Sequence, residues 1–209
     1  MKHYFKLLTL AVALSLPALA SSVDFSNGGG TLAGTNAGLT LTGSTLISVI
    51  EPTIPTIFTG DLGTVAFSTG TLNGGSLQMG GTFAAGGSFV ITSNGSFGLP
   101  AGTIFSGTFD GPAVWVLVTL ANRTHNYTLT GTLTGTWLTG ATVSGVTVQL
   151  TINTGKGFFD GSTGLSSGNS DFTGPGVTTF GAVREPTSII YLGTGLISIA
   201  GLVRRKMRL

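Results

Sequence analysis

The residues of this chain that could carry out acid–base or nucleophilic chemistry are few and scattered. His125 is the only histidine between the two chain ends, and it lies beside Arg123 in a predicted turn. A histidine is a common general base near neutral pH, but we expect this one to be an exposed turn residue. The run 164–168 reads GLSSG and matches the G-x-S-x-G nucleophile motif at Ser166. That motif needs a strand before the serine and a helix after it. Because neither is predicted here, we expect no nucleophile.

The carboxylates could serve two other kinds of chemistry. Asp110 and Asp160 would suit glycoside hydrolysis if they lay about 5–10 Å apart in one groove. Asp160 and Asp171 flank a loop rich in oxygen atoms, but their spacing matches no calcium loop, and with no cysteine in the chain a zinc site is not expected. We therefore expect no catalytic residue, no cofactor and no metal. A carbohydrate-active enzyme remains the less favoured alternative.

Charge is scarce in the body of the chain, and its sign excludes one class of partner. The whole chain has a net charge of +2, but most of its bases lie at the two ends. Residues 21–183 contain two bases against six acids, a net charge of −4. A basic surface for nucleic acid is therefore absent from this segment, and we expect no nucleic-acid partner.

The clearest structural pattern is the alternation in the segment 127–137, YTLTGTLTGTW. Its odd positions are aromatic, leucine or glycine, and its even positions are all threonine. Since successive side chains of a strand point to opposite faces, this pattern predicts a strand with one apolar face and one row of hydroxyl groups. The members of that row are Thr128, Thr130, Thr132, Thr134 and Thr136.

The rest of the body also favours strands and turns. Short alternating or apolar segments recur about every ten residues, and no segment has a helical apolar face. The pattern predicts an all-β protein, an antiparallel sandwich or barrel of many short strands, with a β-solenoid as the alternative. We expect a β-rich extracellular domain over residues 21–161 and a flexible Gly/Ser-rich linker over residues 162–182. Because of Pro52 and Pro55, we predict that residues 51–55 form a loop or an edge. The segment 113–121 is apolar on both faces and is therefore predicted to be a central strand.

The threonine row is a candidate surface-binding face. Polysaccharide sites usually add an aromatic platform, but the alternation places Tyr127 and Trp137 opposite the threonines, in the predicted core. Binding of ice or another crystal surface would require threonine rows on several strands, and only one such row is evident in the sequence. Solubility alone would also explain a hydroxyl-rich face, so polysaccharide binding stays one alternative among these.

The N-terminus has the three parts of a secretory signal peptide. Lys2 and Lys6 give a basic start, an apolar run covers residues 7–16, and Ala18 and Ala20 form a small-x-small cleavage site. We expect signal peptidase to remove residues 1–20 and leave a mature N-terminus near Ser21.

The C-terminus combines a short acidic proline box, an uncharged apolar run over residues 188–203 and a basic end. Such a run is at the short end of the range for a membrane-spanning helix, and basic residues after it favour a cytoplasmic C-terminus. This segment, residues 183–209, resembles the PEP-CTERM sorting signal of Gram-negative bacteria, with Arg184 where the family usually has its first proline. The matching residues are Val183, Glu185, Pro186, Thr187, Arg204, Arg205 and Lys206.

The resemblance implies a route and a setting for the protein. It implies recognition by an exosortase, a membrane-embedded protease that removes the helix near the box after transient anchoring in the inner membrane. It also implies delivery to the cell surface or the extracellular matrix, where family members are associated with biofilm and exopolysaccharide. We therefore expect an exported structural or adhesive protein, with a membrane-retained envelope protein and a polysaccharide-binding module as alternatives.

Overall fold

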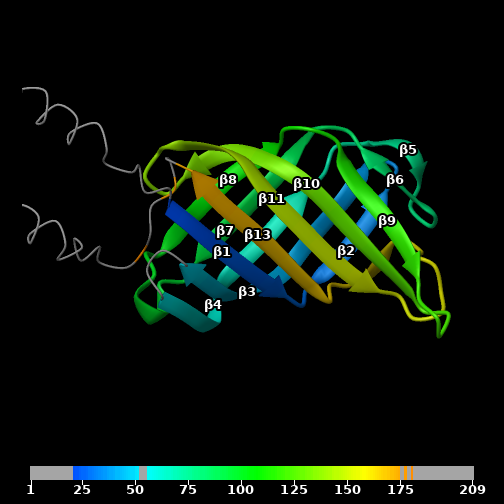
Figure 1. The fold of residues 1–209 in the computed structure, drawn as a ribbon, viewed down its shortest axis with the longest axis horizontal. Helices are drawn as coiled ribbons and strands as arrows, with labels where there is room; N and C mark the ends of the chain where they lie inside the picture. Colours follow the sequence, from blue (N-terminus) through cyan, green and yellow to red (C-terminus); the bar gives the residue numbers. More distant parts are fainter. Residues whose placement is uncertain (1–20, 52–55, 175–176, 178–179, 181–209) are drawn as a thin grey trace, which may run out of the picture.

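The protein is a closed antiparallel β-barrel with short additional strands at one end (Figure 1). The computed structural model describes residues 21–51, 56–174, 177 and 180. Eight of its thirteen strands form the barrel, and each barrel strand pairs with the next barrel strand along the chain. In chain order these are β1 (Ser21–Gly28), β3 (Gly38–Glu51), β4 (Thr56–Ser68), β7 (Gly86–Ser93), β8 (Gly102–Phe109), β10 (His125–Trp137), β11 (Thr142–Asn153) and β13 (Ser167–Gly174).

The barrel closes where β13 lies between β11 and β1. Ser21 of β1 is opposite Gly174 of β13, and Thr151 of β11 is opposite Ser167 of β13. The closed antiparallel circuit excludes the solenoid alternative for the described residues. It also shows that our linker prediction was wrong over the range 162–174, because β13 completes the barrel and belongs to the domain.

Five further strands lie in the connections of the barrel. β9 pairs with the first half of β10, where β8 has already ended, and β6 and β5 continue the sheet beyond β9. β2 pairs with the first half of β3, and β12 pairs with β2. Their bounds are β2 (Thr31–Thr35), β5 (Leu72–Ser76), β6 (Gly80–Phe83), β9 (Ala113–Thr119) and β12 (Ser162–Gly164).

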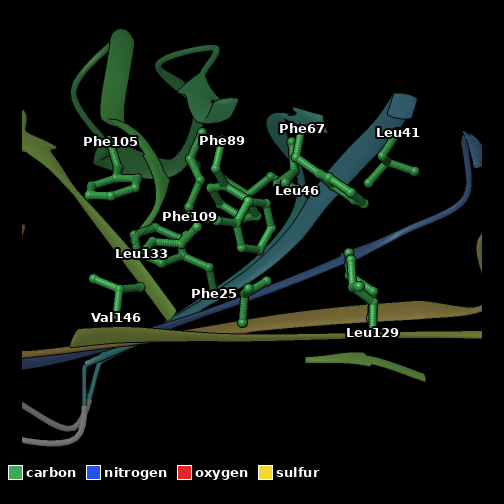
Figure 2. Close-up of a cluster of buried hydrophobic side chains, with 14 of the residues drawn as sticks. Phe25, Leu41, Leu46, Phe67, Phe89, Phe105, Phe109, Leu129, Leu133 and Val146 are labelled. Carbon is green, nitrogen blue, oxygen red and sulfur yellow. The ribbon is translucent and has the colours of Figure 1, made fainter. Parts of the chain in front are cut away.

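Large apolar side chains fill the interior of the barrel (Figure 2). An eight-stranded barrel is just wide enough for inward side chains to fill it. Phe105 packs edge-on against Phe172 with ring centroids 4.7 Å apart, and Phe67 contacts both Phe89 and Phe109. The other large buried rings are Phe25, Phe83, Trp115, Tyr127, Trp137 and Phe159.

One other prediction about a strand needs correction. The apolar segment 113–121 was expected to be buried on both faces, but Val114, Val116 and Val118 of β9 are exposed on the outer face. β9 has a neighbour on its second side only over Ala113–Trp115, through β6.

The two proline positions, the signal peptide and the transmembrane helix predicted over residues 188–203 lie outside the described residues. The described part of the chain includes no helix with the length and hydropathy needed to cross a membrane.

Candidate functional site

The threonine row of β10 lies on the outer face of the barrel, and the neighbouring strands extend it. Leu129, Leu133 and the two aromatic residues of the strand are buried, whereas the threonines are exposed or partly exposed. Along β11 the residues opposite the row are also polar. From one end to the other these are Thr151, Gln149, Thr147, Ser144 and Thr142. The polar outer face of β10 therefore continues onto β11, although the β11 residues are not all threonine.

The polar face continues onto the strands that close the barrel. Thr147 is opposite Asp171 of β13, and Gln149 is opposite Asn169. On the other side of β13, Asp171 is opposite Asp24 of β1. Hydroxyl, amide and carboxylate groups thus lie side by side on β10, β11, β13 and β1.

A groove of about 500 Å³ crosses this polar face. We call it the threonine groove. One side of it is formed by Val114 of β9 and by Pro112, which precedes this strand, and the opposite side by Asn169 and Asp171 of β13. The remaining lining residues come from β10 and β11 and are Thr130, Gly131, Thr132, Thr147, Val148 and Gln149.

Some polar side chains of the groove are hydrogen-bonded within the protein, and others are not. The Thr132 hydroxyl donates to one oxygen of Asp110, and the Thr134 hydroxyl donates to the other at 2.9 Å. Asp110 therefore fixes two threonines of the row. Within the described part of the chain, Thr130 and Gln149 make no side-chain hydrogen bond to the protein. Their polar groups remain available to a ligand.

Two carboxylates face each other at the edge of the groove. Asp24 is partly buried, and its pKa is raised, first by burial and then by the charge of Asp171 and a hydrogen bond with it. A pair of like charges in direct register favours the protonated form of one member. Asp24 was not among the predicted site residues. Asp171 was predicted only as part of a loop, because β13 had been assigned to the linker.

The predicted chemical residues are not brought together into a catalytic arrangement. Asp110 lies in the β8–β9 turn, and Asp160 lies in the connection between β11 and β12. Asp110 is hydrogen-bonded to Thr132 on the outer face, whereas the Phe159 amide, next to Asp160, donates to the Tyr127 hydroxyl. Thr132 and Tyr127 are about 17 Å apart along β10, at ~3.4 Å per residue. The pair therefore does not form the groove that glycoside hydrolysis needs.

His125 is not the exposed turn residue that we expected. It is the first residue of β10, has an exposed fraction of 8% and stacks on Phe158 with ring centroids 4.5 Å apart. Its Nδ1 atom shares a hydrogen bond of 3.0 Å with the Thr119 hydroxyl. A backbone hydrogen bond between Leu120 and Thr124 closes the turn, and β10 begins directly after it at His125.

Ser166 does not lie in a nucleophile elbow. It connects two strands, β12 and β13, so a strand follows it directly where the motif requires a helix. Its hydroxyl accepts a hydrogen bond of 3.2 Å from the backbone amide of Asn153. The described residues include no group of three or more histidine or acidic side chains placed to hold a metal ion.

The large aromatic residues of β9 and β10, which could have formed a platform for sugar stacking, are in the core. Trp115, Tyr127 and Trp137 are all buried, as the alternation predicts for the last two. The groove thus presents hydrogen-bonding groups and small apolar side chains. The residues of the predicted sorting signal and of the signal cleavage site lie outside the described residues.

Comparison of the chain with protein-family models, with curated proteins and with solved structures finds no match. The functional argument therefore depends on the chemistry of the groove and on the sequence of the two ends.

Proposed function

We propose that this chain is an exported protein that an exosortase-like protease delivers to the cell surface or the extracellular matrix, and that its barrel binds polysaccharide there. The observation that carries the binding proposal is the threonine groove, which lies on an exposed face and keeps polar groups free of intramolecular hydrogen bonds. Export and sorting are supported by the sequence of the ends alone. A structural or adhesive role in the matrix follows from these two properties together.

The charge of the groove favours one class of polysaccharide. Asp171 lines it and Asp24 lies beside it, so the local charge is negative. Arg123 and Lys156, the bases of the described residues, lie in other connections, before β10 and after β11. An anionic chain would be repelled without compensation. We therefore propose a neutral or amino-sugar polysaccharide as the ligand.

The binding proposal is tested with three polymers of different charge. We expect a neutral β-glucan or partly deacetylated chitin to retain the barrel and anionic alginate not to do so. Thr130→Ala or Gln149→Ala should each weaken binding about fivefold, because one hydrogen bond contributes ~1 kcal/mol. The control is Thr136→Ala, on the same strand and face but outside the groove. If the control weakens binding as much as the groove variants, or if alginate binds best, the groove is not the site.

The sorting proposal is tested by the intact mass of the protein isolated from its native cells. We expect a species that begins at Ser21 and ends near Glu185 or Pro186. A species ending at Leu209 and found in membranes would contradict processing and would favour the alternative of a membrane-retained envelope protein.

A further inference from the structure

The two ends of the domain leave the barrel side by side. Ser21 begins β1 opposite Gly174, which ends β13, and these strand ends lie together at the left of Figure 1. We call this the terminal end of the barrel. The same end contains the last residue of β3, the first residue of β4 and the β7–β8 and β10–β11 connections, because the barrel strands alternate in direction.

The chain is still held to the barrel at Phe180. Its ring stacks on Trp137 with centroids 5.7 Å apart and lies 6.2 Å from the ring of Phe25. Its backbone amide donates to the carboxylate of Glu51, which is fully buried. Val177 is buried as well. The chain therefore departs from a fixed point at the terminal end.

Three exposed apolar side chains belong to the terminal end: one at the start of β4, one in the β7–β8 connection and one just after β10. Ile57 and Phe97 are each 65% exposed, and Leu138 is 38% exposed. Phe97 has a left-handed backbone with φ of 58°, which a bulky residue rarely adopts. A Cβ atom at Gly60 would come within 3.1 Å of the Phe97 ring, so this glycine makes room for it. The Phe97 side chain therefore lies against β4 at the terminal end and remains mostly exposed.

The sequence beyond Phe180 indicates what these side chains would contact. The uncharged apolar run begins at Ser188, eight residues later. Eight residues span at most about 28 Å even when fully extended. If that run lies in a membrane, the terminal end cannot be far from the lipid surface. If these eight residues span less than their full length, the exposed apolar side chains come into contact with the lipid surface.

We propose that the terminal end of the barrel is a lipid-contacting surface and that Ile57, Phe97 and Leu138 enter the membrane interface while the C-terminal segment anchors the chain. This inference rests on the proposed membrane anchoring before processing. Amphipathic surfaces of this kind bury apolar groups about 5–10 Å into the interface. The exposed carboxylate of Asp61, one residue after Gly60, would stay in the headgroup layer and limit the depth.

The absence of cysteine from the chain makes a direct test simple. The full chain, including residues 183–209, is reconstituted in vesicles of phosphatidylethanolamine and phosphatidylglycerol, with one cysteine carrying an environment-sensitive fluorophore. The test positions are Phe97→Cys and Ile57→Cys. The matched control is Met79→Cys, which is 67% exposed at the opposite end of the barrel, next to the Gln78 carbonyl that accepts from Tyr127.

We expect a blue shift of the emission and quenching by brominated lipid at positions 57 and 97, and neither effect at position 79. Equal responses at positions 97 and 79 in a chain that is bound to the vesicles would overturn the inference and leave the anchoring proposal intact. If the chain fails to bind vesicles at all, the proposed anchor fails, and with it the inference. Circular dichroism of each labelled variant separates these outcomes from misfolding.

Discussion

The pairing of Asp24 with Asp171 makes a prediction about how the stability of the barrel depends on pH. The two residues are opposite each other on β1 and β13, the strands that close the barrel. Burial and the neighbouring carboxylate raise the pKa of Asp24 in the folded protein above its usual value of about 3.9. In the unfolded chain this perturbation is lost. Between the two pKa values the folded state therefore binds more protons than the unfolded state does, and stability decreases as pH rises.

The expected magnitude follows from the geometry of the pair. Favourable cross-strand pairs contribute roughly 0.2–1 kcal/mol, and like charges directly opposite each other are destabilising; we take a cost of the same order. Because Asp24 is only partly buried, solvent screening reduces the effect. We therefore expect Asp171→Asn to stabilise the barrel by ~0.5 kcal/mol at pH 7, or about 1–2 °C in Tm for a domain of this size. Below about pH 3, where Asp24 is mostly protonated in the unfolded state as well, the gain should disappear.

Urea unfolding at a series of pH values measures this difference. Asp24→Asn should give a similar gain, and the double variant should add little to either single variant, because both remove the same repulsion. Asp61→Asn is the control, since Asp61 is exposed on β4 and no carboxylate is paired with it in the strand register. A variant Asp171→Asn that is less stable than the wild type at pH 7 would refute the reasoning.

Two further predictions test the barrel itself. Gly135→Ala should destabilise the protein by roughly 2–4 kcal/mol, because the added Cβ atom would lie 2.5 Å from Gly107 Cα and 2.7 Å from the Phe105 ring. The control is Gly157→Ala, where the added Cβ atom would have its nearest neighbour at 3.9 Å. Thermal unfolding of the two variants checks this, and equal melting temperatures would contradict the close approach of β8 and β10. A chain ending at Gly161 should fail to form a monomer, since it lacks β13 and leaves two barrel edges open, whereas a chain ending at Phe180 should fold. Size-exclusion chromatography separates these cases, and a monomeric folded product ending at Gly161 would contradict the assigned closure.

The sequence predicted the all-β class and the orientation of β10 because strict alternation defines which face is buried. Tyr127 and Trp137 are in the core and Thr130 is on the outer face, as the period of two requires. The same reasoning failed for β13. Its sequence, SGNSDFTG, contains one large apolar residue, Phe172, and its other inward positions are Gly168 and Ser170. Small inward residues give a strand no hydrophobic pattern, although they are needed where larger neighbours crowd the interior.

The groove could not be predicted from the sequence for a related reason. It combines residues from β9, β10, β11 and β13, and their proximity depends on strand register. Asp24 and Asp171 are about 150 residues apart in the sequence and meet only because the barrel closes. Pairing between the first and the last strand leaves no local signal, so the acidic edge of the groove appears only in the folded protein.

The two proposals together predict how the groove would be presented while the chain is anchored. Thr130 lies six residues before Thr136 on β10, or about 20 Å along the strand at ~3.4 Å per residue. With strands tilted by about 40° from the barrel axis, this is a height of roughly 15 Å. Thr136 is near the terminal end, so the groove would lie on the side of the barrel, above the lipid surface and open to the matrix. Cleavage after Phe180 would release the barrel without changing a residue of the groove. Polysaccharide affinity should therefore be the same before and after processing, and a difference between the two forms would show that residues beyond Phe180 take part in binding.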